Sequence, residues 1–168
     1  MTFYKQIYTS PLGEMSLVAD ETGLVGVWFL KQKYFERGLE KATMPVKNDI
    51  LKRTRLLLDD YFSGKYPDFS SLPLAIVGTG FQQRVWAYLQ TIPYGRTVTY
   101  GQIAKELDIH SAQAVGSAVG RNPFSIIVPC HRVLGSQGQL TGYAGGLDKK
   151  IWLLEHEGVE LSEKTLDK

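Results

Sequence analysis

Apolar and polar positions follow a short, strand-like rhythm in the first part of the chain. Residues 3–9, 14–19 and 24–30 are apolar runs rich in β-branched and aromatic side chains. The segments 10–13 and 20–23 separate these runs and contain Gly, Pro, Ser and Asp. Short runs of this kind, bounded by turn-forming residues, are typical of strands joined by tight turns. The pattern therefore predicts an antiparallel meander at the start of the chain.

A helical period replaces the strand rhythm over residues 49–63. Asn48 can cap this helix and Gly64 can end it. Apolar side chains recur in it near every 3.6 residues, at Ile50, Leu57, Leu58, Tyr61 and Phe62. A loop and a further apolar run, residues 72–77, lead to a Gly-Thr-Gly segment. We place a boundary there and predict one domain over residues 1–78 and a second over residues 79–168.

The second block has the pattern of a mainly helical domain. Residues 81–90 carry apolar side chains four positions apart, and Thr99 and Gln102 have the spacing of a capping box before a helix that starts at Tyr100. Ser111 can cap a third helix, residues 112–120. Two short helices with a tight connection suggest a helix-turn-helix, whose second helix would read DNA. The expected fold class is therefore α+β.

The third helix has an unusual composition. It contains only Ala, Gly, Val, Ser and Gln, and no large side chain. Small residues allow another backbone to approach closely. The approaching group could be a DNA strand or a tightly packed neighbouring helix, and the pattern alone leaves both interpretations open.

The most distinctive chemistry lies at residues 129–133, PCHRV, which follow a buried, extended run at residues 124–128. Cys130 is the single cysteine of the chain, and His131 and Arg132 follow it directly. A thiol reacts as its thiolate, and a histidine base or a nearby positive charge favours that form. The alternative is a cysteine that only fills space in the core.

Neighbouring side chains in an extended segment point to opposite faces, so Cys130 and His131 can cooperate only through a water or a turn that begins at Pro129. A histidine base also needs an acceptor that orients it. Glu157, at the end of the last predicted helix, is the best candidate. Helix C-termini disfavour carboxylates, so a buried pair with His131 explains this position better than a solvated side chain.

Composition and charge narrow the classes of function. Hydrophobic residues make up 43% of the 168 residues, enough for a packed core. One cysteine excludes an internal disulfide and a multi-cysteine zinc site, and we expect no metal and no cofactor. No apolar run resembles a signal peptide or a membrane span, so we expect a cytoplasmic protein that does not bind membranes.

The formal charge of +2 is unevenly distributed. Residues 81–150 hold seven Lys and Arg against three Asp and Glu, and residues 151–168 hold two against five. A segment of charge +4 is therefore masked by an acidic tail. It could meet a polyanion at short range, or it could be ordinary solvated surface.

These residues together resemble a known family. PCHR at 129–132, RNP at 121–123 and GYAGG at 142–146 look like the signature of the O6-alkylguanine-DNA alkyltransferases. The resemblance extends to TVTYGQIA at 97–104 and WLLEHEG at 152–158. It covers residues 81–160 densely, whereas residues 1–80 match the family only in length and in the order of strands and helix.

The resemblance implies an N-terminal ribonuclease-H-like α/β domain and a C-terminal, mainly helical, winged-helix-like domain with a helix-turn-helix. It also implies repair of double-stranded DNA that carries O6-alkylguanine, with O4-alkylthymine as a further candidate substrate. The protein, a monomer, would bind the minor groove, flip the damaged base out and transfer the alkyl group irreversibly to Cys130, once per molecule.

The resemblance also assigns roles to single residues. Cys130 would accept the alkyl group, His131 would deprotonate it through a water, Glu157 would orient His131 and Asn122 would brace the turn. The residues expected to contact DNA or the flipped base are Tyr100, Gln113, Ala114, Arg121, Val133, Tyr143, Ala144 and Lys150. Among them, Tyr100 would crowd the phosphate or donate a proton to the leaving guanine.

Two positions depart from the family pattern. Many members have an arginine at the position of Gln113, where it fills the stack left by the flipped base, and some have a serine at the position of Ala144. We expect Gln113 to weaken DNA binding or alter base flipping without abolishing transfer. Two other functions remain open from the residues themselves: a cysteine hydrolase, and a DNA-lesion-binding or regulatory helix-turn-helix protein without catalysis.

Overall fold

The computed structural model describes residues 2–36 and 47–161 of the chain. Its contacts group into two compact units, one formed by residues 1–76 with 123–127 and one by residues 77–122 with 128–168. The chain thus returns to the first unit for one short segment, residues 123–127, whereas the sequence predicts a single boundary between residues 78 and 79. Among the described residues, no helix combines the length and apolar character that crossing a bilayer requires.

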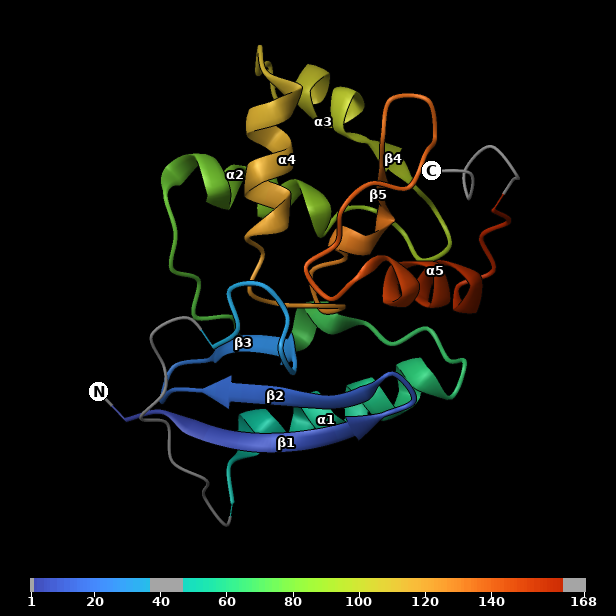
Figure 1. Cartoon of the computed structure of the whole chain (residues 1–168). Helices are drawn as coiled ribbons and strands as arrows, with labels where there is room; N and C mark the ends of the chain where they lie inside the picture. Colours follow the sequence, from blue (N-terminus) through green and yellow to red (C-terminus); the bar gives the residue numbers. More distant parts are fainter. Residues whose placement is uncertain (1, 37–46, 162–168) are drawn as a thin grey trace. The chain divides into compact units, whose positions relative to one another are not determined.

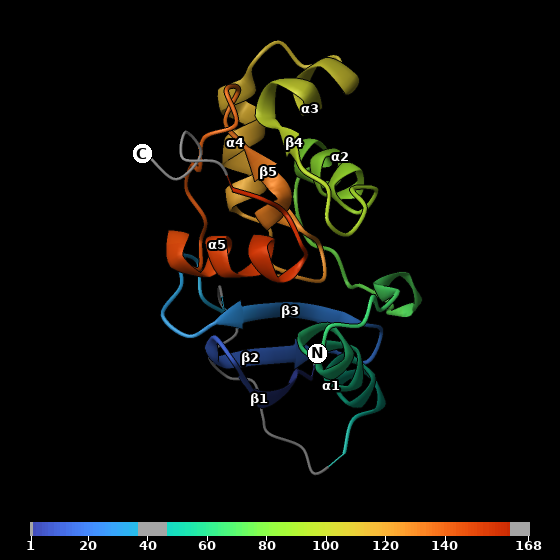
Figure 2. The same cartoon turned by 90° about the vertical axis from the view of Figure 1, so that its right-hand side faces the viewer.

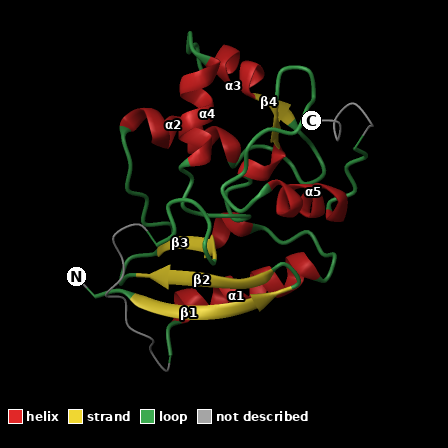
Figure 3. Ribbon diagram, viewed as in Figure 1, coloured by secondary structure: helices red, strands yellow, loops and turns green. Residues whose placement is uncertain are grey.

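The first unit is a three-stranded antiparallel sheet with one long helix beside it (Figures 1 and 3). The strands are β1 (Tyr4–Ser10), β2 (Gly13–Ala19) and β3 (Leu24–Phe29), in the order β1-β2-β3. The helix α1 (Asp49–Phe62) packs against β1 and β2, and a short 3-10 turn, η1 (Phe69–Ser71), follows it. The predicted meander and first helix are therefore confirmed.

Two side-chain hydrogen bonds fix the start of α1 and its position on the sheet. The Asn48 side chain accepts a hydrogen bond from the Leu51 N–H and caps α1 as expected. Tyr8 on β1 donates its hydroxyl to Asp59 on α1 at 2.7 Å, which ties helix and sheet together. Figure 2 shows α1 lying along one face of the sheet. The buried core of this unit includes Leu17, Val27, Trp28, Phe29, Leu58 and Tyr61.

The segment 123–127 lies beside β3 in this unit, but it is not the extended run that the sequence predicted. Val27 exchanges backbone hydrogen bonds with Pro123 and Ser125, so the pairing covers a single bridge at Phe124. The chain then turns sharply: the Ile127 N–H donates to the Ser125 carbonyl, and Ile126 has a φ of 71°. All five apolar-run residues from 124 to 128 are nevertheless buried. Burial, not an extended backbone, explains their apolar character.

Four helices dominate the second unit: α2 (Gly80–Leu89), α3 (Tyr100–Glu106), α4 (Ala112–Gly120) and α5 (Leu147–His156). Their bounds agree with the predicted helices to within one residue for the first three. The capping box predicted for α3 is present, and α2 has a second one. α4 contacts both α2 and α3, as Figures 1 and 2 show.

A small parallel pair joins the two parts of the second unit. β4 (Val98–Thr99) pairs with β5 (Val133–Leu134), and β5 follows directly on a 3-10 turn, η2 (Cys130–Arg132). Because α3 begins where β4 ends, this pairing holds the start of α3 close to the cysteine segment. Figure 1 shows β4 and β5 between α3 and α5.

The small side chains on one face of α4 are explained by packing against the neighbouring helices. Val115, Ala118 and Val119 are buried, and the Trp86 indole N–H donates to the Ala118 carbonyl at 2.8 Å. A Cβ on Gly116 would lie 3.7 Å from the Tyr100 ring, so the helix approaches α3 closely there. The packing interpretation therefore accounts for this face, whereas Ala112, Gln113, Ser117 and Gly120 are exposed.

Candidate active site

A turn that begins at Pro129 positions the cysteine. From the sequence, such a turn is one of two ways in which Cys130 and His131 could cooperate. The Arg132 N–H donates to the Pro129 carbonyl at 3.1 Å and the Cys130 N–H donates to the Val128 carbonyl at 2.8 Å. The Asn122 side-chain amide donates to the same Val128 carbonyl, also at 2.8 Å. Residues 130–132 therefore form one 3-10 turn, braced from outside by Asn122, rather than an extended strand.

The Cys130 thiol is enclosed and protonated at rest. The residue is only 7% exposed. Burial raises the pKa of the Cys130 thiol, while a hydrogen bond from Asn122 and the positive charge of Lys150 lower it to a smaller extent. A thiol in these surroundings needs a base to become a nucleophile.

His131 has the arrangement of such a base. Its Nε2 lies 2.6 Å from the Glu157 Oε2, and both side chains are fully buried. Because an ionised carboxylate can only accept, Nε2 carries the hydrogen and donates it to Glu157. Burial lowers the pKa of His131, and the neighbouring Glu157 opposes this without cancelling it. The ring is therefore neutral, and Nδ1, which has no hydrogen-bond partner within the described residues, can take up a proton.

Glu157 is held by more than the histidine. The Arg132 Nε and Nη2 donate to its two oxygens at 2.8 and 3.0 Å, and the Gly95 N–H donates to Oε1 at 3.2 Å. Burial alone would raise the pKa of Glu157, but His131 and Arg132 outweigh it and hold that pKa well below its usual range. The carboxylate stays ionised, as an orienting group must.

Sequence reasoning missed Arg132 and Gly95 as partners of Glu157. The sequence alone indicates only that Arg132 places a positive charge beside the cysteine, whereas in the structure its guanidinium also donates to the Ile92 carbonyl at 2.7 Å. Gly95 lies in the turn after α2, and its φ of 78° lets its N–H reach Glu157. An arginine next in sequence to a histidine that is expected to pair with a buried carboxylate is the signal that could have revealed the contact between Arg132 and Glu157.

Lys150 lies beside the cysteine with no exposed surface. Its Nζ donates to the carbonyls of Thr141 at 3.2 Å and Gly142 at 3.5 Å. Burial lowers the pKa of Lys150 to about 8, and the Cys130 thiolate opposes this fall. The ammonium thus fixes the 141–142 segment and places a positive charge near the sulfur.

Tyr100, the first residue of α3, lies at the same site. The Thr141 hydroxyl donates to its phenol oxygen at 3.0 Å. Burial raises the pKa of Tyr100, the hydrogen bond from Thr141 lowers it, and the charge of the Cys130 thiolate raises it further. Tyr100, Lys150 and Cys130 are therefore neighbours, although they are far apart in the sequence. Thr141 carried no signal in the sequence.

The remaining predicted residues have more varied surroundings. Val133 is buried in β5, whereas Tyr143 and Ala144 are half-buried in a turn closed by the Gly146 N–H on the Tyr143 carbonyl. On α4, Gln113 is exposed and Ala114 half-buried in the first turn, and Arg121 caps the C-terminus. The predicted site thus has a buried cluster around Cys130 and a separate group on α4.

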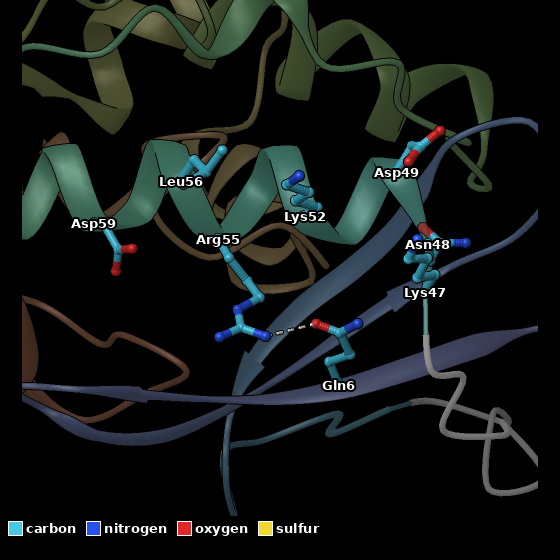
Figure 4. Close-up of a pocket in the computed structure, with 8 residues that line it drawn as sticks. All are labelled: Gln6, Lys47, Asn48, Asp49, Lys52, Arg55, Leu56 and Asp59. Carbon is cyan, nitrogen blue, oxygen red and sulfur yellow. Dashed lines mark hydrogen bonds between the residues drawn. The ribbon is translucent and has the colours of Figure 1, made fainter.

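A pocket of about 450 Å³ lies elsewhere, between β1 and α1 of the first unit (Figure 4). Figure 4 shows Arg55 hydrogen-bonded to Gln6 among its lining side chains. None of the predicted site residues lines it. Within residues 2–36 and 47–161, no three His, Cys, Asp or Glu side chains are grouped to hold a metal ion.

These contacts define a class of protein. Cys130 is buried, and the neutral His131 that follows it is held by the ionised Glu157. These residues lie in the same unit as α3 and α4, two short helices that contact each other. Two family models agree with this class. The ribonuclease-like domain of 6-O-methylguanine DNA methyltransferases matches residues 3–76, and the DNA binding domain of the same enzymes matches residues 80–159.

Curated relatives and solved structures match over nearly the whole chain. The methylated-DNA–protein-cysteine methyltransferase of Methanosarcina acetivorans is 46% identical over 157 residues, 92% of this chain and 98% of the relative. The enzyme of that name from Haemophilus influenzae is 38% identical over 164 residues, 96% of this chain and 89% of the relative. The chain belongs to the O6-methylguanine-DNA methyltransferase family.

The structures extend this result to the fold. The crystal structure of Mycobacterium tuberculosis O6-methylguanine methyltransferase matches with a TM-score of 0.80 and 40% identity, over 93% of each chain. A structure of the same organism's protein in complex with DNA also gives 0.80 and 40%, over 94% of this chain and 92% of that one. The resemblance predicted from residues 81–160 and the expected two-part fold are therefore confirmed.

Proposed function

We propose that this protein repairs double-stranded DNA by transferring the O6-alkyl group of a damaged guanine to Cys130. The observation that carries the proposal is the buried Cys130 beside a neutral His131 whose Nε2–H is fixed by Glu157 at 2.6 Å. This arrangement supplies a thiolate only when a base removes the proton. The names of the relatives, which are methylated-DNA–protein-cysteine methyltransferases, support the same reaction.

The reaction is a displacement at a saturated carbon. The Cys130 thiol gives its proton through a water to His131 Nδ1, the nitrogen left open by the bond to Glu157. The thiolate sulfur then attacks the alkyl carbon, so the S–C bond forms as the C–O6 bond breaks. The electron pair of that bond stays with the guanine, which becomes an anion and needs a proton.

Two groups near the sulfur assist the departure of guanine. Tyr100 donates its phenol proton to the guanine anion, which leaves as a neutral base, and the phenolate recovers a proton from His131 or from solvent. The Lys150 ammonium favours the thiolate before attack. The thioether formed on Cys130 is stable, so each molecule reacts once.

The remaining roles concern the DNA. We assign minor-groove contact to α4, with Gln113 and Ala114 on its first turn and Arg121 at its end, because its exposed face carries small side chains that admit a close approach. Asn122 braces the active-site turn, and Val133, Tyr143 and Ala144 surround the flipped base. We place binding and transfer in the domain predicted at residues 79–168, and we propose a cytoplasmic monomer.

A titration of methyl transfer tests the reaction. Limiting protein is incubated with a duplex that contains O6-methylguanine labelled in the methyl group, and label bound to protein is counted over time. We expect transfer to stop at one methyl per protein molecule and to be absent in Cys130→Ser, which should still bind the duplex. Repeated turnover of an ester or peptide substrate by the wild type, without methyl on the protein, would support a cysteine hydrolase instead.

A further inference from the structure

Thr141 makes a contact that the proposed chemistry has not used. Its Oγ1 donates a hydrogen bond to the Tyr100 phenol oxygen at 3.0 Å, across 41 positions of sequence. Its backbone is held separately, because the Lys150 Nζ donates to its carbonyl at 3.2 Å. The hydroxyl is therefore presented to Tyr100 by an anchored segment rather than by a free loop.

We propose that Thr141 is a positioning residue for transfer: its hydroxyl occupies one side of the Tyr100 oxygen and directs the phenol O–H toward the leaving guanine. This inference rests on the proposed function, in which Tyr100 protonates guanine. It assigns no direct contact with the substrate to Thr141 itself.

The geometry of a phenol gives the reason. The oxygen carries one hydrogen and can accept bonds at its lone pairs. When Thr141 donates to it, the O–H cannot point at Thr141 and must point elsewhere. The ring itself has little freedom, since Thr99 caps the helix that starts at Tyr100 and the α4 backbone at Gly116 lies close to the ring edge. A fixed ring with one occupied side leaves the O–H a narrow range of directions.

Thr141 also stabilises the charge that Tyr100 acquires. When the phenol proton moves to guanine, the oxygen becomes a phenolate, and the hydrogen bond from Thr141 then joins a neutral donor to an anion. Such bonds are stronger than those between neutral groups. The same bond lowers the pKa of Tyr100 against the effect of burial, which is the direction that helps proton donation. The phenolate later regains its proton, so the hydroxyl of Thr141 is unchanged after the reaction.

Two variants, compared with the wild type, test this role in single-turnover transfer from a duplex containing O6-methylguanine. Thr141→Val removes the donor and keeps the shape, and we expect the rate constant of transfer to fall about tenfold, the effect of one hydrogen bond to a charged group. Thr141→Ser keeps the hydroxyl and should restore the rate. The dissociation constant for the duplex should be the same in all three proteins. If Thr141→Val does not fold, Thr141→Ala measured against Thr141→Ser makes the same comparison.

A double-mutant cycle separates positioning from packing. In a Tyr100→Phe background there is no phenol to direct, so adding Thr141→Val should leave the already reduced rate unchanged. A tenfold further loss in that background, or an unchanged rate in Thr141→Val alone, would overturn the inference. Wild-type protein that transfers no methyl group would instead overturn the proposed function, so the two failures are distinguishable.

Discussion

At the scale of single residues, the site keeps its nucleophile inactive until a base acts. Burial raises the pKa of Cys130 and lowers that of His131, so the resting pair is a thiol and a neutral imidazole. The carboxylate of Glu157 is ionised and shared between His131 and Arg132. Removing the Arg132 side chain would leave the buried carboxylate of Glu157 without its cationic partner. Loss of one partner of a buried ion pair strongly lowers the free energy of unfolding.

Lys150 gives a prediction on pH and stability. Its pKa is about 8 in the folded protein and 10.5 when free. Below pH 8 both states are protonated and the penalty for burying the charge is fully present. Between pH 8 and 10.5 the unfolded chain binds more protons than the folded one, so stability rises with pH. The free energy of unfolding of the wild type minus that of Lys150→Met should therefore increase by up to about 3 kcal/mol over this range.

Urea unfolding at several pH values measures this difference. Both proteins should carry Cys130→Ser, so that titration of the thiol does not contribute. Lys149→Met, a change at the neighbouring half-buried position, is the matched control and should not reproduce the trend. A difference that stays constant from pH 8 to 10.5, the range between the folded and the free pKa of Lys150, would contradict the burial of a charged Lys150.

Gln113 gives a prediction on DNA binding. It is exposed on the first turn of α4, at the position for which the family resemblance implies an arginine in many members. Gln113→Arg restores a planar charge that can stack and pair with phosphate, so the dissociation constant for a methylated duplex should fall, by about three- to tenfold. Fluorescence anisotropy checks this, with Gln113→Lys as the control for charge without a planar group. Equal binding and equal transfer rates in Gln113→Arg and the wild type would refute the role.

At the scale of elements, local signals predicted helix ends well. Asn48, Thr99 and Ser111 each cap the helix expected from the sequence, because capping depends on a side chain and the N–H groups two or three residues later. The run at residues 124–128 was mispredicted for the opposite reason. An apolar pattern reports burial, and the turn at Ile126 depends on pairing with β3, almost a hundred residues earlier.

The two capping boxes allow a matched prediction. Thr79→Ala and Thr99→Ala should each lower the free energy of unfolding by about 1 kcal/mol. Only Thr99 precedes Tyr100, so only Thr99→Ala should also slow methyl transfer, by several-fold, since it loosens the first turn of α3. Chemical unfolding and single-turnover transfer measure the two effects. Equal transfer rates in both variants would show that the cap of α3 does not position Tyr100.

At the scale of the whole molecule, the sequence predicted the class of fold and the buried pairing of His131 with Glu157, but not the other contacts of the candidate site. Cys130, His131 and Glu157 followed from a motif and a helix end, since their chemistry is local to a few positions. Thr141, Gly95 and the second role of Arg132 depend on contacts between segments that only the tertiary structure brings together. The charge of residues 81–150 stays ambiguous, because the unit that holds the site contains both this basic segment and the acidic residues 151–168.

The account rests on one covalent event, and intact-mass measurement with peptide mapping tests it most directly. The full chain is incubated with a duplex that contains a single O6-methylguanine and is then analysed before and after proteolysis. We predict one added CH₂ group per protein molecule, on the peptide that contains Cys130 and on its sulfur. No added mass, or a methyl group on any other residue, would contradict the central claim.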